Sequence, residues 1–146
     1  MPDRRGEGSA GADWASLSAP SIADFERMAD AAFAALPEAF RRMCEGVVIR
    51  VLDFPDEETL AAMDCETPFD LLGLFHGRGL AQSGMVPETG QFPNFVYLYR
   101  RPILDYWAEH EETLGDIVTH VLVHEIGHHF GLSDEDMEAI EAAADA

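Results

Sequence analysis

Apolar residues recur at helical spacing near the start of the chain. From Ser21 to Pro37 they return every three or four positions, which predicts an amphipathic helix that the proline ends. Ser21 and Asp24 have the spacing of a capping box, in which each residue satisfies a backbone N–H of the other. A shorter helix is expected over residues 37–45, ending at Gly46.

The pattern becomes β-like in the middle of the chain. Three short segments are rich in β-branched and aromatic residues and predict strands: Val47–Phe54, Leu71–Gly77 and Asn94–Pro102. In the third, alternation places Phe95, Tyr97 and Tyr99 on one face, and Pro102 is expected to close the strand. A helical turn is expected over residues 56–63, and a loop rich in Gly, Pro, Gln and Ser over residues 77–93.

Helical spacing returns in the last third. Leu114–Phe130 is expected to form a long helix, which Gly131 can end as a left-handed cap. The final segment, 133–146, predicts another helix, with Ser133 and Asp136 as a second capping box. Helices therefore come first, short strands occupy the middle and helices finish. That order predicts an α+β domain.

The length and composition are those of one domain with a hydrophobic core. The chain has 146 residues, of which 47% are hydrophobic. Residues 1–20 mix charged residues with Gly, Ala, Ser and Pro and predict a disordered N-terminal tail, leaving 21–146 as a single domain. No segment resembles a secretory signal or a membrane span. Cys44 and Cys65 form no CxxC pair, which favours two reduced thiols and a cytoplasmic location.

The net charge of the chain limits the classes of binding partner that are expected. Nine arginines face 28 acidic residues, which gives a net charge of −19. Such a surface repels nucleic-acid phosphates and anionic lipids, so neither nucleic acid nor membrane is an expected partner. Solubility is the favoured interpretation of the charge, and a cationic partner is the alternative, so the expected partner is a peptide or protein that could be basic.

The helix that ends near Phe130 carries the candidate chemistry. His124 and His128 lie four residues apart, so their side chains are about 40° apart on one face and can reach one ion. Glu125 flanks them, as in H-E-x-x-H helices where a glutamate is the general base for a zinc-bound water. Because this helix is apolar nearly all round, it should be buried. A cation would offset the cost of burying these three side chains, which otherwise need hydrogen-bond partners in the core.

A zinc site of this kind needs a third protein ligand. Asp134 is the first candidate, because Gly131 lets the chain turn back beneath the ion. Asp134 also falls in the first turn of the last helix, where an acidic residue is favoured for electrostatic reasons alone. Glu138 is the reserve candidate and Glu135 a weaker one.

The remaining residues of interest have mainly structural interpretations. His129 points about 100° away from His128 and is expected to be a core or hydrogen-bonding residue. His120 lies one turn before His124, so it lines the same face, where plain packing is favoured over a supporting role near the metal. Met137 is expected in the core, with a floor beneath the zinc as the alternative.

The segment "HEIGHHFGLSD" looks like H-E-x-x-H-x-x-G-x-x-D, a variant of the extended metzincin signature with aspartate as the third ligand. With "LLGLFHG" and "VYLYRRPI", it resembles the bacterial minimal zincin-like metallopeptidase family over residues 37–142. The resemblance implies a small zincin-like domain, in which a short mixed sheet packs against the H-E-x-x-H helix with further helices at both ends. It also implies zinc bound by His124, His128 and Asp134, with Glu125 as the base. His76 departs from the family, where we expect an acidic residue.

A zinc-dependent peptidase is therefore the expected function. In zincins an edge strand beside the active helix holds the substrate, and "NFVYLYR" is our candidate for that strand. One alternative is a non-catalytic, metal-stabilised protein-binding module with the same ligands. Another is a metal-dependent ribonuclease, which Glu125 and the acidic surface disfavour. The substrate and the oligomeric state are not predicted.

Overall fold

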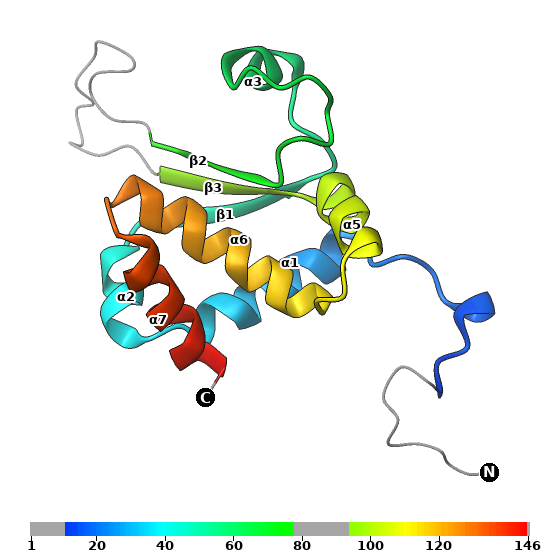
Figure 1. The fold of residues 1–146 in the computed structure, drawn as a ribbon, viewed down its shortest axis with the longest axis horizontal. Coiled ribbons are helices and arrows are strands. Elements are labelled where there is room, and N and C mark those ends of the chain that lie inside the picture. Colours follow the sequence, from blue (N-terminus) through cyan, green and yellow to red (C-terminus); the bar gives the residue numbers. More distant parts are fainter. Residues whose placement is uncertain (1–10, 78–93, 146) are drawn as a thin grey trace.

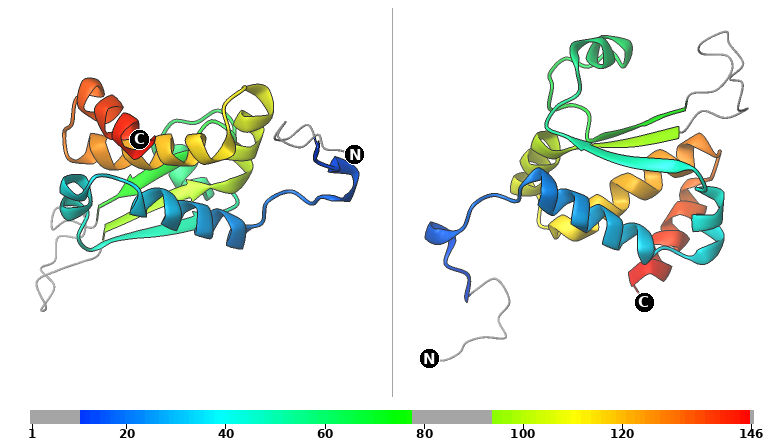
Figure 2. Two further views of the ribbon diagram at one scale, coloured as in Figure 1. Left: turned by 90° about the horizontal axis from the view of Figure 1, so that it is seen from below. Right: turned by 180° about the vertical axis from the view of Figure 1, so that it is seen from behind.

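The computed structural model describes residues 11–77 and 94–145, and in them the chain is an α+β domain (Figure 1). One face of a three-stranded sheet is covered by α1, α6 and their neighbours, and α3 lies beyond the other face (Figures 1 and 2). The α-helices are α1 (Ile22–Ala34), α2 (Glu38–Met43), α3 (Glu57–Ala62), α5 (Arg100–Glu109), α6 (Leu114–His129) and α7 (Asp134–Asp145). The strands are β1 (Val47–Leu52), β2 (Gly73–His76) and β3 (Asn94–Tyr99), and a 3-10 turn, η2 (Trp14–Ser16), precedes α1.

The sheet is mixed, and β3 is its central strand. β1 pairs with β3 in parallel, with Val48 opposite Phe95, and β2 pairs with β3 in antiparallel fashion, with Phe75 opposite Val96. The expectation that "NFVYLYR" is an edge strand is therefore wrong, because β3 has a hydrogen-bonded neighbour on both sides. Its aromatic face is as predicted, since Tyr97 stacks on both Phe95 and Tyr99.

The core lies between the sheet and the helices, with α6 at its centre. Leu122, Val123 and Ile126 of α6 are fully buried, as are Val96 and Leu98 of β3. Because each such side chain contributes about 1.5–3 kcal/mol when removed from water, α6 is among the most firmly held elements of the domain. A side chain on α6 is therefore held on a rigid support.

Capping boxes fix the starts of α1 and α7. The amide of Asp24 donates to Ser21 Oγ at 3.0 Å, and the Ser21 amide donates to Asp24 Oδ2 at 2.8 Å. Ser133 and Asp136 repeat the arrangement at 3.0 and 3.3 Å. Gly131 has a φ of 77°, the left-handed conformation predicted for the end of α6. Each hydroxyl cap is worth about 1 kcal/mol of helix stability.

Helix α5 is the element that the sequence pattern did not predict. The strand does end at Tyr99, but Pro102 lies in the first turn of a helix rather than in a loop. Proline is tolerated there because the first turn of a helix has no partner for its backbone N–H. The long guanidinium of Arg100 anchors this start by donating to the Pro20 carbonyl at 2.6 Å and to Asp53 Oδ1 at 2.9 Å.

The other expectations concern the thiols, the tail and the loop. Both cysteines are free, and burial raises the pKa of Cys44 to about 11, so its thiol stays protonated. None of the helices in residues 11–77 and 94–145 is long and apolar enough to cross a membrane. The loop predicted over residues 77–93 lies outside the described residues except for Gly77, and a tail over 1–20 stays a prediction.

Candidate metal centre

The histidines of the motif lie side by side on α6. The ring centroids of His124 and His128 are 5.7 Å apart and the rings are nearly perpendicular. The side chain of His124 is only 23% exposed, whereas His128 is exposed at the last turn of the helix. One side of the pair is thus embedded in the domain, and the other is open to solvent.

The electrostatic surroundings of His124 favour its neutral form. Burial lowers the pKa of His124, and His120 lowers it further, while the charges of Glu141 and Asp134 act in the opposite direction. An imidazole must be neutral to donate a lone pair to a metal ion. His124 is therefore in the state that a metal ligand requires near neutral pH.

Glu125 points from α6 toward β2. Its Cγ is 3.4 Å from the position that a Cβ on Gly73 would occupy, and its carboxylate accepts a hydrogen bond from the backbone N–H of Phe75. Burial raises the pKa of Glu125, and the nearby His128 and the Phe75 amide oppose that shift. A carboxylate with a raised pKa holds a proton more readily, which suits a general base.

Glu141 of α7 is the carboxylate that approaches His124. Its Oε2 lies 3.2 Å from His124 Nε2 and 3.1 Å from His120 Nδ1. His120, His124 and Glu141 are the residues, among those described, whose metal-ligand atoms all lie within 4.8 Å of one another.

The structure does not gather the predicted ligands His124, His128 and Asp134 into such a group. Asp134 is exposed at the start of α7, although its charge still raises the pKa of His124. The ligand role of Asp134 therefore stays a prediction. The reserve candidates Glu138 and Glu135 are exposed on α7.

The antiparallel course of α6 and α7 explains why Glu141 was missed. Met137 packs on Gly127, and Glu141 faces His120 and His124, so residues further along α7 meet residues earlier on α6. Glu141 follows Asp134 by seven residues, which returns it to the same side of the helix two turns later. This spacing was visible in the sequence, but the way the two helices pack was not.

The other candidates have structural roles. His129 is exposed and stacks on Phe75 with a centroid distance of 3.9 Å, so the expectation of a core position is wrong. Phe75 also meets Phe130 edge to face at 6.3 Å, so β2 lies beside the end of α6. His76 meets Tyr97 edge to face at 6.5 Å. Met137 is fully buried, as predicted for a core residue.

The side chains on α6 and α7 fit a zinc ion. Imidazoles and carboxylates are the usual zinc donors of catalytic sites, and His124 is held neutral. In addition, Glu141 Oε2 is buried without a hydrogen-bond partner. Since a buried carboxylate oxygen without a partner is costly, a cation beside it would relieve that cost.

Gly73 sets the distance between β2 and Glu125. A Cβ at this position would lie 2.6 Å from Val121 Cγ1 and 2.9 Å from the Tyr97 carbonyl oxygen. Gly73→Ala is therefore expected to lower the free energy of unfolding by about 1–3 kcal/mol, measured by urea denaturation. Gly115→Ala, at an exposed position on α6, is the control and should not destabilise the protein, because nothing lies within 4 Å of the place that its Cβ would occupy. Equal stability of the two variants would contradict this close packing.

No curated protein matches the sequence of this chain. A family model described as zincin-like metallopeptidase matches residues 44–144, more than two thirds of the 146 residues. The match includes the three strands, the whole of α6 and nearly all of α7. The candidate metal ligands and Glu125 lie on α6 and α7. The chain therefore belongs to the family of zincin-like metallopeptidases.

Proposed function

We propose that the protein is a zinc-dependent peptidase in which His124, His128 and Asp134 hold the metal and Glu125 is the general base. The observation that carries the proposal is the arrangement on α6. The rigid helix α6 carries the neutral imidazole of His124, a second imidazole, that of His128, one turn away, and the Glu125 carboxylate with its raised pKa. Zinc, when bound, supplies Lewis-acid polarisation of the scissile carbonyl and makes a water molecule acidic near neutral pH.

The chain's own residues would then handle the proton. Glu125 takes it from the attacking water and passes it to the leaving nitrogen, because the amine cannot leave as an anion. The Phe75 amide and the packing against Gly73 hold the Glu125 carboxylate in one orientation for both transfers. The solvent exposure of His128 keeps one side of the pair open. That openness favours a peptidase over a binding module with a covered ion.

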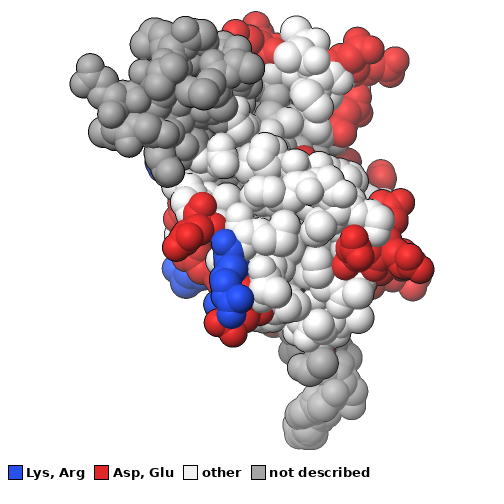
Figure 3. Space-filling model, turned by 90° about the vertical axis from the view of Figure 1, so that its left-hand side faces the viewer, with Lys and Arg blue, Asp and Glu red and all other residues white. Residues whose placement is uncertain are grey.

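The outer side of β2 is the proposed place for the substrate. β2 pairs with β3 on one side, and within the described sheet its other side has no strand beside it. An extended peptide could add there by main-chain hydrogen bonds, close to Glu125. Acidic side chains lie around a largely uncharged face of the molecule (Figure 3). These acidic side chains and the net charge of −19 support a preference for basic substrates. The two free thiols support a cytoplasmic location.

A peptide-library digest tests this proposal. The zinc-loaded protein is expected to cleave a subset of peptides, enriched in Lys and Arg near the cut because of the acidic surface. Treatment with a chelator should abolish cleavage, and added zinc should restore it. Mass spectrometry of the products measures both effects. Cleavage that persists after complete removal of metal would contradict a zinc mechanism.

A further inference from the structure

We propose that His120, His124 and Glu141 form a second position for a divalent cation, different from the set that the motif predicts. The two positions share His124, but the new one lies one turn earlier on α6 and takes its carboxylate from Glu141, two turns further along α7 than Asp134. The inference requires metal binding at α6 and does not depend on peptidase activity.

The distances between the donor atoms match those around a zinc-like ion. Ligands about 2.0–2.1 Å from a tetrahedral ion are about 3.3 Å from one another. Glu141 Oε2 lies 3.2 Å from His124 Nε2 and 3.1 Å from His120 Nδ1. The rings of His120 and His124 lie against each other, with centroids 3.9 Å apart. A cation could therefore meet all three donors with small side-chain adjustments.

One oxygen of the Glu141 carboxylate lacks a hydrogen-bond partner. The Oε1 atom lies within hydrogen-bond distance of His120 Nδ1, at 3.1 Å, whereas Oε2 is buried and makes no hydrogen bond, although two imidazole nitrogens lie within 3.2 Å of it. A contact without good hydrogen-bond geometry leaves the lone pairs of that oxygen unused. A cation bound between the oxygen and the two nitrogens would use them.

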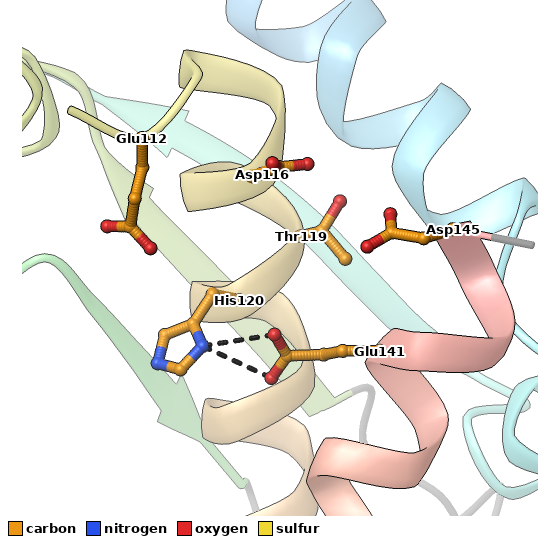
Figure 4. Close-up of a pocket in the computed structure, with 6 residues that line it drawn as sticks. All are labelled: Glu112, Asp116, Thr119, His120, Glu141 and Asp145. Atoms are coloured by element: carbon orange, nitrogen blue, oxygen red, sulfur yellow. Dashed lines mark hydrogen bonds and ion pairs between the residues drawn. The ribbon is translucent and has the colours of Figure 1, made fainter.

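The surroundings favour a cation at this place. A cavity of about 160 Å³ adjoins His120 and Glu141, and its wall includes the carboxylates of Glu112, Asp116 and Asp145. Figure 4 shows His120 and Glu141 directed toward each other from α6 and α7, with the other acidic residues around them. These charges lower the electrostatic energy of a divalent ion, and the cavity has room for its water ligands.

Because both positions use His124, they cannot be occupied by metal ions at the same time. The Nε2 atom of one imidazole carries one lone pair, so it can bind one ion at a time. A cation held by His120 and Glu141 therefore withdraws His124 from the predicted catalytic set. The chain would bind one ion through His124 in either of two places.

Cobalt titration of the full chain tests this inference. In His128→Ala/Asp134→Ala, which lacks two ligands of the predicted set, calorimetry is expected to show one bound Co²⁺. Adding Glu141→Gln or His120→Ala should weaken that binding at least about 100-fold, the upper end of what loss of a supporting partner costs. Glu111→Gln, which removes an exposed charge outside the cavity, is the matched control and should leave the affinity unchanged.

The outcomes separate this inference from the proposed function. Loss of all Co²⁺ binding in the folded double variant would overturn the second position and leave the proposed catalytic set standing. Unchanged affinity after Glu141→Gln would overturn it as well. If circular dichroism shows the double variant to be unfolded, Asp134→Asn replaces it as the background, and the effect of Glu141→Gln there decides. Failure of the natural chain to bind any metal would overturn both proposals.

Discussion

Glu125→Gln is expected to bind zinc as tightly as the natural chain and to hydrolyse peptides about 10²–10⁴-fold more slowly. Glutamine keeps the size of the side chain and can still accept the hydrogen bond from the Phe75 amide. It cannot take a proton from water, so only the chemical step should suffer. Elemental analysis measures the zinc content, and a fluorogenic peptide taken from the library digest measures kcat/KM.

The matched control for this substitution is Glu111→Gln, at an exposed position outside the site, which should retain full activity. If Glu125→Gln also retained full turnover, Glu125 would not be the base. If the variant lost zinc together with activity, Glu125 would act on the metal rather than on the proton. The two measurements together distinguish these cases.

His124→Ala is expected to remove metal binding from the chain. His124 is the ligand common to the predicted set and to the second position, so neither of these two sets keeps three donors without it. Zinc at 100 times its dissociation constant stabilises a binding protein by about 2.7 kcal/mol. The natural chain should therefore show a rise in Tm when zinc is added, and His124→Ala should show none. Differential scanning calorimetry measures the shift.

His110→Ala serves as the control for His124→Ala. His110 is an exposed histidine that stacks on Tyr106 at the end of α5, away from the pair on α6. It should keep the full response to zinc. A zinc-dependent rise in Tm in His124→Ala would show that the metal is held elsewhere, and neither proposed ligand set would then describe the protein.

Local patterns predicted the helices well and the pairing of strands poorly. The caps at Ser21 and Ser133 depend on neighbours three residues away, so the sequence contains all the information needed. The central place of β3 depends on β1 and β2, which join it from distant parts of the chain. Helix α5 was missed for a local reason, because Pro102 was interpreted as a strand terminator rather than as a first-turn residue.

In the candidate site, too, the contacts within one helix were predictable from the sequence, and the contacts between elements were not. His124, Glu125 and His128 share one helix, so a single motif predicts their relation. The approach of Glu141 depends on how α7 packs against α6, and the need for Gly73 depends on how β2 crosses α6. Neither contact is encoded by a spacing along the chain. They become visible only when the tertiary packing is known.

The antiparallel packing of α7 on α6 gives the C-terminal helix two duties at once. Met137 fills the core against Gly127, and Glu141 supplies a carboxylate to the imidazoles from the same rigid segment. Shortening the chain ahead of α7 would therefore open the hydrophobic interior and remove both candidate carboxylate ligands, Asp134 and Glu141, in one event. Conversely, an ion bound between the two helices would cross-link α7 to the buried helix α6 and reduce local unfolding of α7.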